Sequence, residues 1–194
     1  MSQPPTKMID PAESQLPTLH AKRVTLRWLK ESDVRDLYAI FSDPEVARYW
    51  SEAAYTEEGQ AKELLDRIRT SFASRSLFQW GVVRPDENRV IGTVTLASLD
   101  TQNRRAELGF ALNRDEWGSG LMSEAVAELV RFAFENLELH RLEADIDPRN
   151  DASIRLVERL GFQREGLLRE RWIVAGEIND TVLYGLLARE WQAG

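Results

Sequence analysis

Cysteine is absent from the 194 residues, and histidine occurs only twice, at His20 and His140. The missing cysteines exclude disulfide bonds, thiolate metal ligands and a cysteine nucleophile. Two histidines are too few for the usual histidine-based zinc sites, so we expect no metal cofactor. A chain without disulfides suits a reducing compartment, and we expect a cytoplasmic location.

Long apolar runs and an excess of positive charge are also missing. No run of 18 apolar residues occurs, and the N-terminus lacks the features of a signal peptide, so we expect neither a membrane span nor a secretory leader. The net charge of -7 disfavours nucleic-acid binding, which requires cationic groups against phosphates. The same charge suits a cationic acceptor molecule, whereas an anionic cofactor needs a local binding site of its own.

Proline is concentrated at the start of the chain, where four of the seven prolines lie within residues 1–20. This segment shows no apolar periodicity, so we predict a flexible N-terminal tail there. A single domain is predicted over residues 21–194, because no linker or internal repeat divides that stretch.

Apolar periodicity predicts the elements of this domain. The predicted strands are 24–28, 77–83, 90–99, 104–112, 140–146, 162–174 and 178–187. The predicted helices are 33–41, a short one opening at Pro44, 56–72, 121–136 and 153–160. Their order predicts an α/β fold (α+β in segregated schemes), with one mixed, mostly antiparallel sheet of about seven strands flanked by helices. Strands 104–112 and 140–146 are expected to be parallel, joined by a right-handed crossover.

The turn Trp117-Gly118-Ser119-Gly120 precedes the strongest predicted helix. Its glycines permit a sharp turn and a close backbone approach to a ligand, and the N–H groups that begin a helix attract anions. The same glycines also suit an ordinary strand-to-helix turn, so spacing alone leaves both interpretations open. No P-loop pattern is present, and Ser123 replaces the third glycine of a dinucleotide-binding fingerprint, so neither of those folds is expected.

Glu107 lies on a predicted central strand, on the face that also carries two small residues. A carboxylate in that setting predicts a groove with a base at its floor, and the alternative is an ion pair with Arg104 or Arg105. The segment Asn150-Asp151-Ala152-Ser153 either caps the next helix or offers hydrogen bonds to a ligand amide.

The order of these segments resembles the GNAT N-acetyltransferase superfamily and, within it, the RimJ/RimL-type branch, over about residues 19–192. The resemblance is carried by Ala106-Glu107-Leu108-Gly109-Phe110, Trp117-Gly118-Ser119-Gly120-Leu121-Met122-Ser123-Glu124-Ala125, Asn150-Asp151-Ala152-Ser153-Ile154-Arg155 and Leu160-Gly161-Phe162. It implies acetyl-CoA as co-substrate, bound where two adjacent parallel strands splay apart. The implied cofactor-binding residues are Phe110, Ala111, Leu112, Trp117, Gly118, Ser119, Gly120, Leu121, Met122, Asn150 and Arg155.

Two departures from the family pattern bear on mechanism. Asp115 stands where the family has Arg or Gln, so pyrophosphate binding is expected to rest on backbone N–H groups. Val157 stands where the family has a tyrosine general acid, and the resemblance implies Ser153 as its replacement. Glu107 is the expected base, acting directly or through water on an attacking amine. Without cysteine, we expect direct transfer in a ternary complex.

Three aromatic residues are candidates for the acceptor wall, although each also suits a core position: Tyr49, Trp50 and Trp172. The expected function is acetyl transfer to a primary amine, first of all a protein N-terminal α-amine. A small amine (polyamine, amino sugar or antibiotic) and a non-catalytic acyl-CoA-binding module are the alternatives. The sequence leaves the oligomeric state open, a homodimer included.

Overall fold

The computed structural model describes residue 9 and residues 12–192, and within them the chain forms one eight-stranded sheet. The strand order is β1-β2-β3-β4-β5-β6-β8-β7, and β5–β6 is its parallel pair. The strands are β1 (Leu19–His20), β2 (Thr25–Arg27), β3 (Phe78–Val83), β4 (Val90–Asp100), β5 (Arg105–Leu112), β6 (Arg141–Ile146), β7 (Gln163–Val174) and β8 (Glu177–Leu187). The helices are α1 (Val34–Phe41), α2 (Pro44–Ala47), α3 (Glu58–Ala73), α4 (Leu121–Glu135) and α5 (Asp151–Arg159), with 3-10 turns η1 (Glu31–Asp33) and η2 (Arg114–Glu116).

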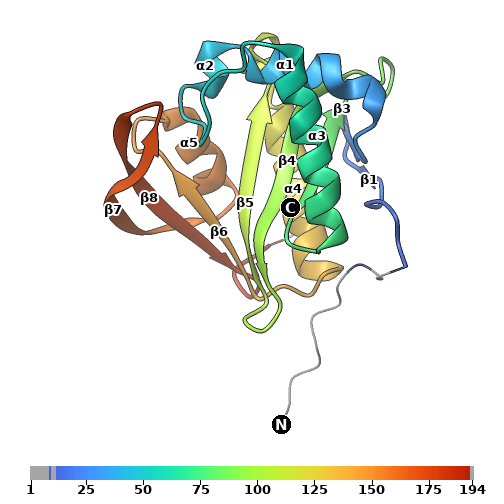
Figure 1. The fold of residues 1–194 in the computed structure, drawn as a ribbon. Helices are drawn as coiled ribbons and strands as arrows, with labels where there is room; N and C mark the ends of the chain where they lie inside the picture. The colour runs from blue at the N-terminus through green and yellow to red at the C-terminus, as the bar shows by residue number, and fades with distance from the viewer. Residues whose placement is uncertain (1–8, 10–11, 193–194) are drawn as a thin grey trace.

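Helices cover both faces of the sheet (Figure 1). Leu37, Ile40 and Leu65 of α1 and α3 pack in one apolar cluster, whereas Leu129 of α4 and Val157 of α5 pack in the other. Successive side chains of a strand point to opposite faces, so one strand supplies both layers. The predicted α/β architecture and its parallel strand pair are therefore confirmed.

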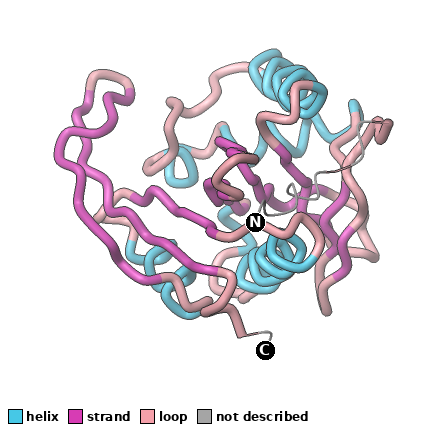
Figure 2. Tube along the Cα trace, turned by 90° about the horizontal axis from the view of Figure 1, so that it is seen from below, coloured by secondary structure: helices cyan, strands magenta, loops and turns pink. Residues whose placement is uncertain are grey.

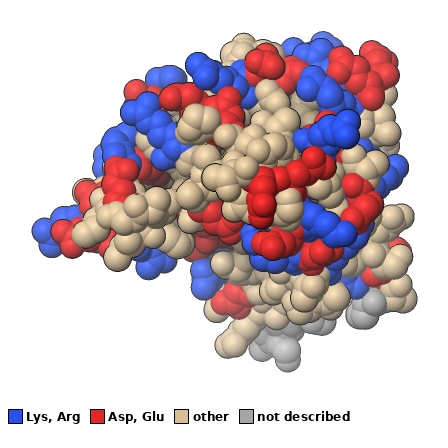
Figure 3. All heavy atoms as spheres, turned by 45° about the horizontal axis from the view of Figure 1, so that its top comes forward, with Lys and Arg blue, Asp and Glu red and all other residues tan. Residues whose placement is uncertain are grey.

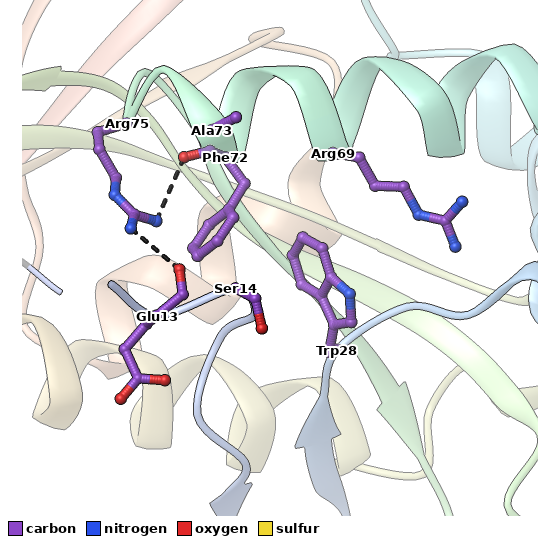
Figure 4. A pocket seen from close by; sticks show the side chains of 7 residues that line it. All are labelled: Glu13, Ser14, Trp28, Arg69, Phe72, Ala73 and Arg75. Carbon is purple, nitrogen blue, oxygen red and sulfur yellow. Dashed lines mark hydrogen bonds between the residues drawn. The ribbon is translucent and has the colours of Figure 1, made fainter. Parts of the chain in front are cut away.

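The described part of the N-terminal segment is packed, which corrects the predicted tail over residues 1–20. Leu16 and Leu19 are 2% and 6% exposed, and the indole N–H of Trp80 donates to the carbonyl of Pro17 at 2.8 Å. Arg75 donates to the carbonyl of Glu13 at 3.1 Å, beside a small cavity under α3 (Figure 4). Burying a leucine contributes roughly 1.5–3 kcal/mol, which offsets part of the conformational entropy lost when this segment is ordered. The rest of the predicted tail, residues 1–8, 10 and 11, lies outside the described residues.

The eighth strand and a buried ion pair are further differences from the sequence prediction. Strand β1 is two residues long, too short to show any alternation, so the expected count of about seven becomes eight. Asp33 precedes α1 at the N-cap position, but its side chain makes no capping hydrogen bond to that helix. Its carboxylate instead accepts from both terminal guanidinium nitrogens of Arg27, at 2.7 and 2.9 Å, and from the backbone N–H of Lys30.

The two halves of the sheet separate between β5 and β6. These strands pair only from Arg105 with Arg141 to Glu107 with Glu143, and then diverge toward their C-terminal ends (Figure 1). Beyond Glu107, β5 continues to pair with β4, and β6 continues to pair with β8 as far as Ile146. This divergence is the opening that the family resemblance implied.

The β7–β8 hairpin extends well beyond the rest of the sheet (Figure 2). Its pairing is interrupted between Leu168 and Trp172, where Glu170 has a φ of 54°. The extra residues increase the local twist and turn the hairpin tip. None of the described helices is long and apolar enough to cross a membrane.

Candidate active site

A groove of about 1260 Å³ opens where β5 and β6 separate. Its walls come from α2 and the loop after it, α3, the start of α4, the start of α5 and the β7–β8 hairpin. The surface near this end shows uncharged residues between regions in which positive and negative side chains are interspersed (Figure 3). Every predicted site residue lines the groove except Ser119 and Leu121.

The glycine turn before α4 has the geometry of an anion site. Gly118 and Gly120 have φ values of 73° and 77°, which disfavour other residues, and a Cβ at Gly118 would meet nothing within 4 Å. The backbone N–H groups of Met122 and Ser123 have no backbone acceptor among the described residues. These free N–H groups, with the positive end of the α4 dipole, fit a pyrophosphate.

Trp117 lies at the edge of this turn, 49% exposed, and its indole N–H donates to the carbonyl of Leu112 at 2.9 Å. The side chains of Ser119 and Leu121 point away from the groove. The Ser119 hydroxyl donates to the carbonyl of Glu116, and Leu121 is buried in the core. These two residues can therefore contact a cofactor only through their backbone.

Three ion pairs between distant segments hold the turn, and none of them was predicted from the sequence. Arg23 donates to the carbonyl of Ser119 at 3.0 Å, and its guanidinium also pairs with Glu124 in the first turn of α4. On the other side, the carboxylate of Glu116 is nearly buried and pairs with Arg84 and Arg89 of the β3–β4 connection. Arg23 is 96 residues from Ser119 in sequence, so no local pattern could indicate the contact.

The start of α5 supplies the opposite wall. The side-chain oxygen of Asn150 accepts from the backbone N–H of Ser153 at 3.1 Å, so Asn150 caps the helix and keeps its amide N–H₂ for another partner. No hydrogen bond of the Ser153 hydroxyl is found within the described part of the chain. Arg155 is exposed at the groove edge. Val157 is fully buried in the core, so this position offers the groove no acid.

Glu107 lies on the groove floor without a structural partner. Neither Arg104 nor Arg105 pairs with it; Arg105 binds Glu143 at 2.9 Å instead, and no hydrogen bond or ion pair of the Glu107 carboxylate is found among the described residues. Burial raises the pKa of Glu107 above its usual value, and the nearby charges of Asp145 and Glu143 raise it further. The alternative interpretation, an ion pair with Arg104 or Arg105, is thus not observed, and the carboxylate is free to accept a proton.

Asp145 of β6 is a groove carboxylate that the sequence did not single out. It accepts from the indole N–H of Trp172 at 3.1 Å and from the hydroxyl of Thr181, and the guanidinium of Arg171 lies 3.8 Å away. Its partners are 26 to 36 residues away along the chain, so its role depends on the β6–β8–β7 pairing. Asp145 thereby fixes the orientation of Trp172 at the groove.

The other two predicted aromatic residues differ in how firmly they are held. Trp50 packs on Phe41 with ring centroids 5.3 Å apart, so it is partly a core residue. Tyr49 is half-buried, with the guanidinium groups of Arg48 and Arg149 at 5.3 and 5.8 Å from its ring. Both rings line the groove, so the predicted aromatic wall is assembled from α2 and its following loop together with β7.

Within residues 9 and 12–192, no group of three or more His, Asp or Glu side chains is arranged to hold a metal ion.

Comparisons with known proteins agree with the geometry. The family profile described as "Acetyltransferase (GNAT) domain" matches residues 23–163. The "Uncharacterized N-acetyltransferase p20" of Bacillus licheniformis is 36% identical over 174 residues, which cover 90% of this chain and 98% of that protein. The "[Ribosomal protein uS5]-alanine N-acetyltransferase" of Escherichia coli is 32% identical over 120 residues, or 61% of this chain and 62% of that protein.

A solved structure shows the same fold. The spermidine N-acetyltransferase of Vibrio cholerae, crystallised with CoA and spermine, superposes with a TM-score of 0.76 at 23% identity, over 87% of this chain and 97% of that chain. The profile match over residues 23–163 and the 36% identity with the Bacillus licheniformis protein confirm the family resemblance inferred from the four sequence segments.

Proposed function

Because the chain belongs to the GNAT acetyltransferase family and is an acyl-CoA-dependent N-acyltransferase, we propose that it transfers acetyl from acetyl-CoA directly to a primary amine, first of all a protein N-terminal α-amine. The observation that carries the proposal is one groove holding both required parts. The glycine turn of α4 lies at one wall, and the unpaired carboxylate of Glu107, with its raised pKa, lies on the floor.

The cofactor side of the groove is assigned to the predicted residues. The backbone from Trp117 to Met122, extended by the N–H of Ser123, would hold the pyrophosphate, and β5 at Phe110–Leu112, where β5 has no β6 partner, would hold the pantetheine arm. The Asn150 amide and the exposed cation of Arg155 complete this side. A net charge of -7 is compatible with this anion, because the site is made of oriented backbone groups.

The amine must attack the thioester carbonyl as the free base. Glu107 accepts its proton, directly or through one water, and a raised pKa brings the carboxylate closer to the pKa of an amine. A backbone N–H on the unpaired edge of β5 polarises the carbonyl. The thiolate can leave without strong acid help, since thiols have pKa values of about 8.5, and the Ser153 hydroxyl donates a hydrogen bond to the sulfur.

An α-amine is the first choice of acceptor because its pKa of about 8 makes it much easier to deprotonate than a lysine at about 10.4. The RimJ/RimL-type motifs and the similarity to a ribosomal-protein N-acetyltransferase support the same choice. A small amine such as a polyamine, an amino sugar or an antibiotic is the alternative, since the carboxylates of Glu107 and Asp145 suit any cation.

The proposal is tested by thiol release from acetyl-CoA with a panel of N-terminal peptides, polyamines, amino sugars and antibiotics. We expect turnover with peptide α-amines, no turnover with the same peptides N-methylated to tertiary amines, and a strong loss in Glu107→Gln. Turnover confined to small amines would overturn the peptide assignment. Tight acetyl-CoA binding with no turnover on any amine would establish the non-catalytic module instead.

A further inference from the structure

The groove continues past Glu107 across β4 to β3, where it has a polar floor. Gln79 of β3 and Thr95 of β4 are direct partners in the β3–β4 register, and Thr95 is the partner of Gly109 on β5. Two residues further along the same strands, Ala97 of β4 pairs with Glu107 of β5. Paired residues point to the same face of a sheet, so Gln79, Thr95 and Glu107 share the groove face, and all three line the groove.

Gln79 and Thr95 are buried polar residues whose side chains lack partners. Their exposed fractions are 4% and 7%, and no hydrogen bond of either side chain is found within the described part of the chain. Among the described residues, the side-chain polar atoms that are both fully enclosed and unpaired belong to Arg84, Thr93 and Trp191. The polar atoms of Gln79 and Thr95 therefore keep some exposure to the groove. The Gln79 carboxamide thus faces the groove, where a ligand can reach it.

The Gln79 carboxamide can hydrogen-bond only to water in the groove, and a ligand that displaces this water must replace its hydrogen bonds, because a donor or acceptor removed from water without a partner is destabilising. Such a group is retained readily where a ligand satisfies it. A carboxamide presents both an acceptor and two donors, so its best complement is another amide. A second ammonium group offers donors alone and would leave the Gln79 N–H₂ unpaired.

The position of Gln79 matches an amide near the reacting amine. With strands about 4.8 Å apart and a rise of about 3.4 Å per residue, the Cα atoms of Gln79 and Glu107 are roughly 12 Å apart. An extended acceptor whose amine lies at Glu107 places its first two peptide units over Thr95 and Gln79. A small monoamine reaches neither residue.

We propose that Gln79, assisted by Thr95, is the acceptor subsite that binds the first two peptide units after the reacting amine, and so selects N-terminal peptides over polyamines. This inference rests on the proposed function for the identity of the reacting amine. It assigns to β3 and β4 a recognition role separate from the base on β5.

The test compares kcat/KM of wild type, Gln79→Leu and Thr95→Val with alanylalanine amide and with n-butylamine. Each acceptor is compared only with itself across variants, so differences in amine basicity cancel. We expect Gln79→Leu to lower kcat/KM for the dipeptide amide roughly 10- to 100-fold, mostly through KM, as two lost hydrogen bonds would. The value for n-butylamine should stay within twofold. Gln102→Leu, on the exposed β4–β5 turn, is the matched control and should change neither acceptor.

A second substitution at Gln79 and a stability measurement distinguish a binding role from a structural role for this residue. Gln79→Glu, which supplies an anion, should shift the preference from the dipeptide amide toward putrescine. Gln79→Leu should leave the Tm unchanged or raise it, because the Gln79 side chain makes no hydrogen bond within the described part of the chain that the fold would lose. A fall in Tm together with unchanged dipeptide kinetics would show that Gln79 is structural and would overturn the subsite.

Binding in the presence of CoA separates this inference from the proposed function. Calorimetry measures the Kd of alanylalanine amide for the CoA-saturated protein, which needs no chemistry. If wild type acetylates no amine, the proposed function fails, yet weaker dipeptide binding by Gln79→Leu would still support the subsite. Equal binding by the two proteins, or no binding to wild type, would overturn it.

Discussion

Replacing Glu107 by glutamine tests the chemistry most directly, because the two side chains have the same shape and only the base is lost. General-base catalysis contributes about 10²- to 10⁴-fold. An α-amine with a pKa of about 8 is already about one-tenth deprotonated at pH 7, so the base is needed only during attack. We therefore expect kcat to fall about 100-fold, equivalent to ~2.7 kcal/mol in the barrier.

The pH dependence of kcat/KM tests whether the lost activity of Glu107→Gln is due to the loss of a base. Wild-type kcat/KM should decline below the pKa of the substrate amine, about 8, and should decline more steeply once Glu107 is protonated. This second decline should have a pKa above the usual glutamate value, because burial and the charge of Asp145 both raise the pKa of Glu107. In Glu107→Gln the second decline should disappear and the limb of the amine should remain, whereas Asp145→Asn should move the second decline to lower pH. Thiol release measured from pH 5 to 9 provides the profiles. Equal kcat for Glu107→Gln and wild type across pH 6–9 would refute the base assignment.

The same shift gives an independent stability measurement. A carboxyl whose pKa is raised in the folded state favours folding below its unfolded pKa, near 4.3, and this contribution is lost as the pH rises through the folded pKa. Glu107→Gln should therefore have a higher Tm than wild type at pH 8, and the difference should shrink toward pH 4. A lower Tm at pH 8 would show that Glu107 has a stabilising partner.

Three further substitutions test other parts of the structure. Ser153→Ala should lower kcat less than tenfold, far less than Glu107→Gln, because a thiolate needs little acid help; a larger loss in the same assay would make Ser153 the acid. Arg23→Gln should raise KM for acetyl-CoA about 3- to 10-fold with kcat within twofold, because it loosens the Ser119 turn without touching the amine; an unchanged KM in initial-rate kinetics would contradict this positioning. Asp33→Ala should destabilise the fold by about 3–5 kcal/mol in urea unfolding, because the buried Arg27 loses its carboxylate counterion, and a change under 1 kcal/mol would refute it.

Local patterns in the sequence predict the parts of the fold and site that depend on neighbouring residues. The stripes of α3 and α4 define those helices, and the alternation along 104–112 places Glu107 on the groove face. The glycines of the α4 turn are recognisable because their backbone requirement is local. Strand β1 has only two residues and no such pattern, so it was missed.

The contacts that complete the site depend on chain pairing and were not predictable from one segment. Arg23 reaches Ser119 across 96 residues, and Asp145 meets Thr181 across 36. In the sequence, Gln79 is one polar residue within a predicted strand and has no feature that indicates a site. Its position in the groove follows only from the pairing of β3 with β4, which sets Gln79 beside Thr95. Burial of a polar side chain is decided by what packs over it, which a sequence window does not contain.

The separation of β5 from β6 assigns acyl-CoA binding and amine binding to different segments of the chain. Every residue proposed to hold the acyl carrier or act on the thioester lies between Glu107 and Arg155, whereas the walls around the amine come from Tyr49 to Thr95 and from Trp172. Acceptor preference can therefore diverge in the outer segments while the acyl-transfer segment is conserved. A chimera that keeps residues 105–160 and takes its flanking segments from a relative should retain acetyl-CoA use and acquire the acceptor range of that relative.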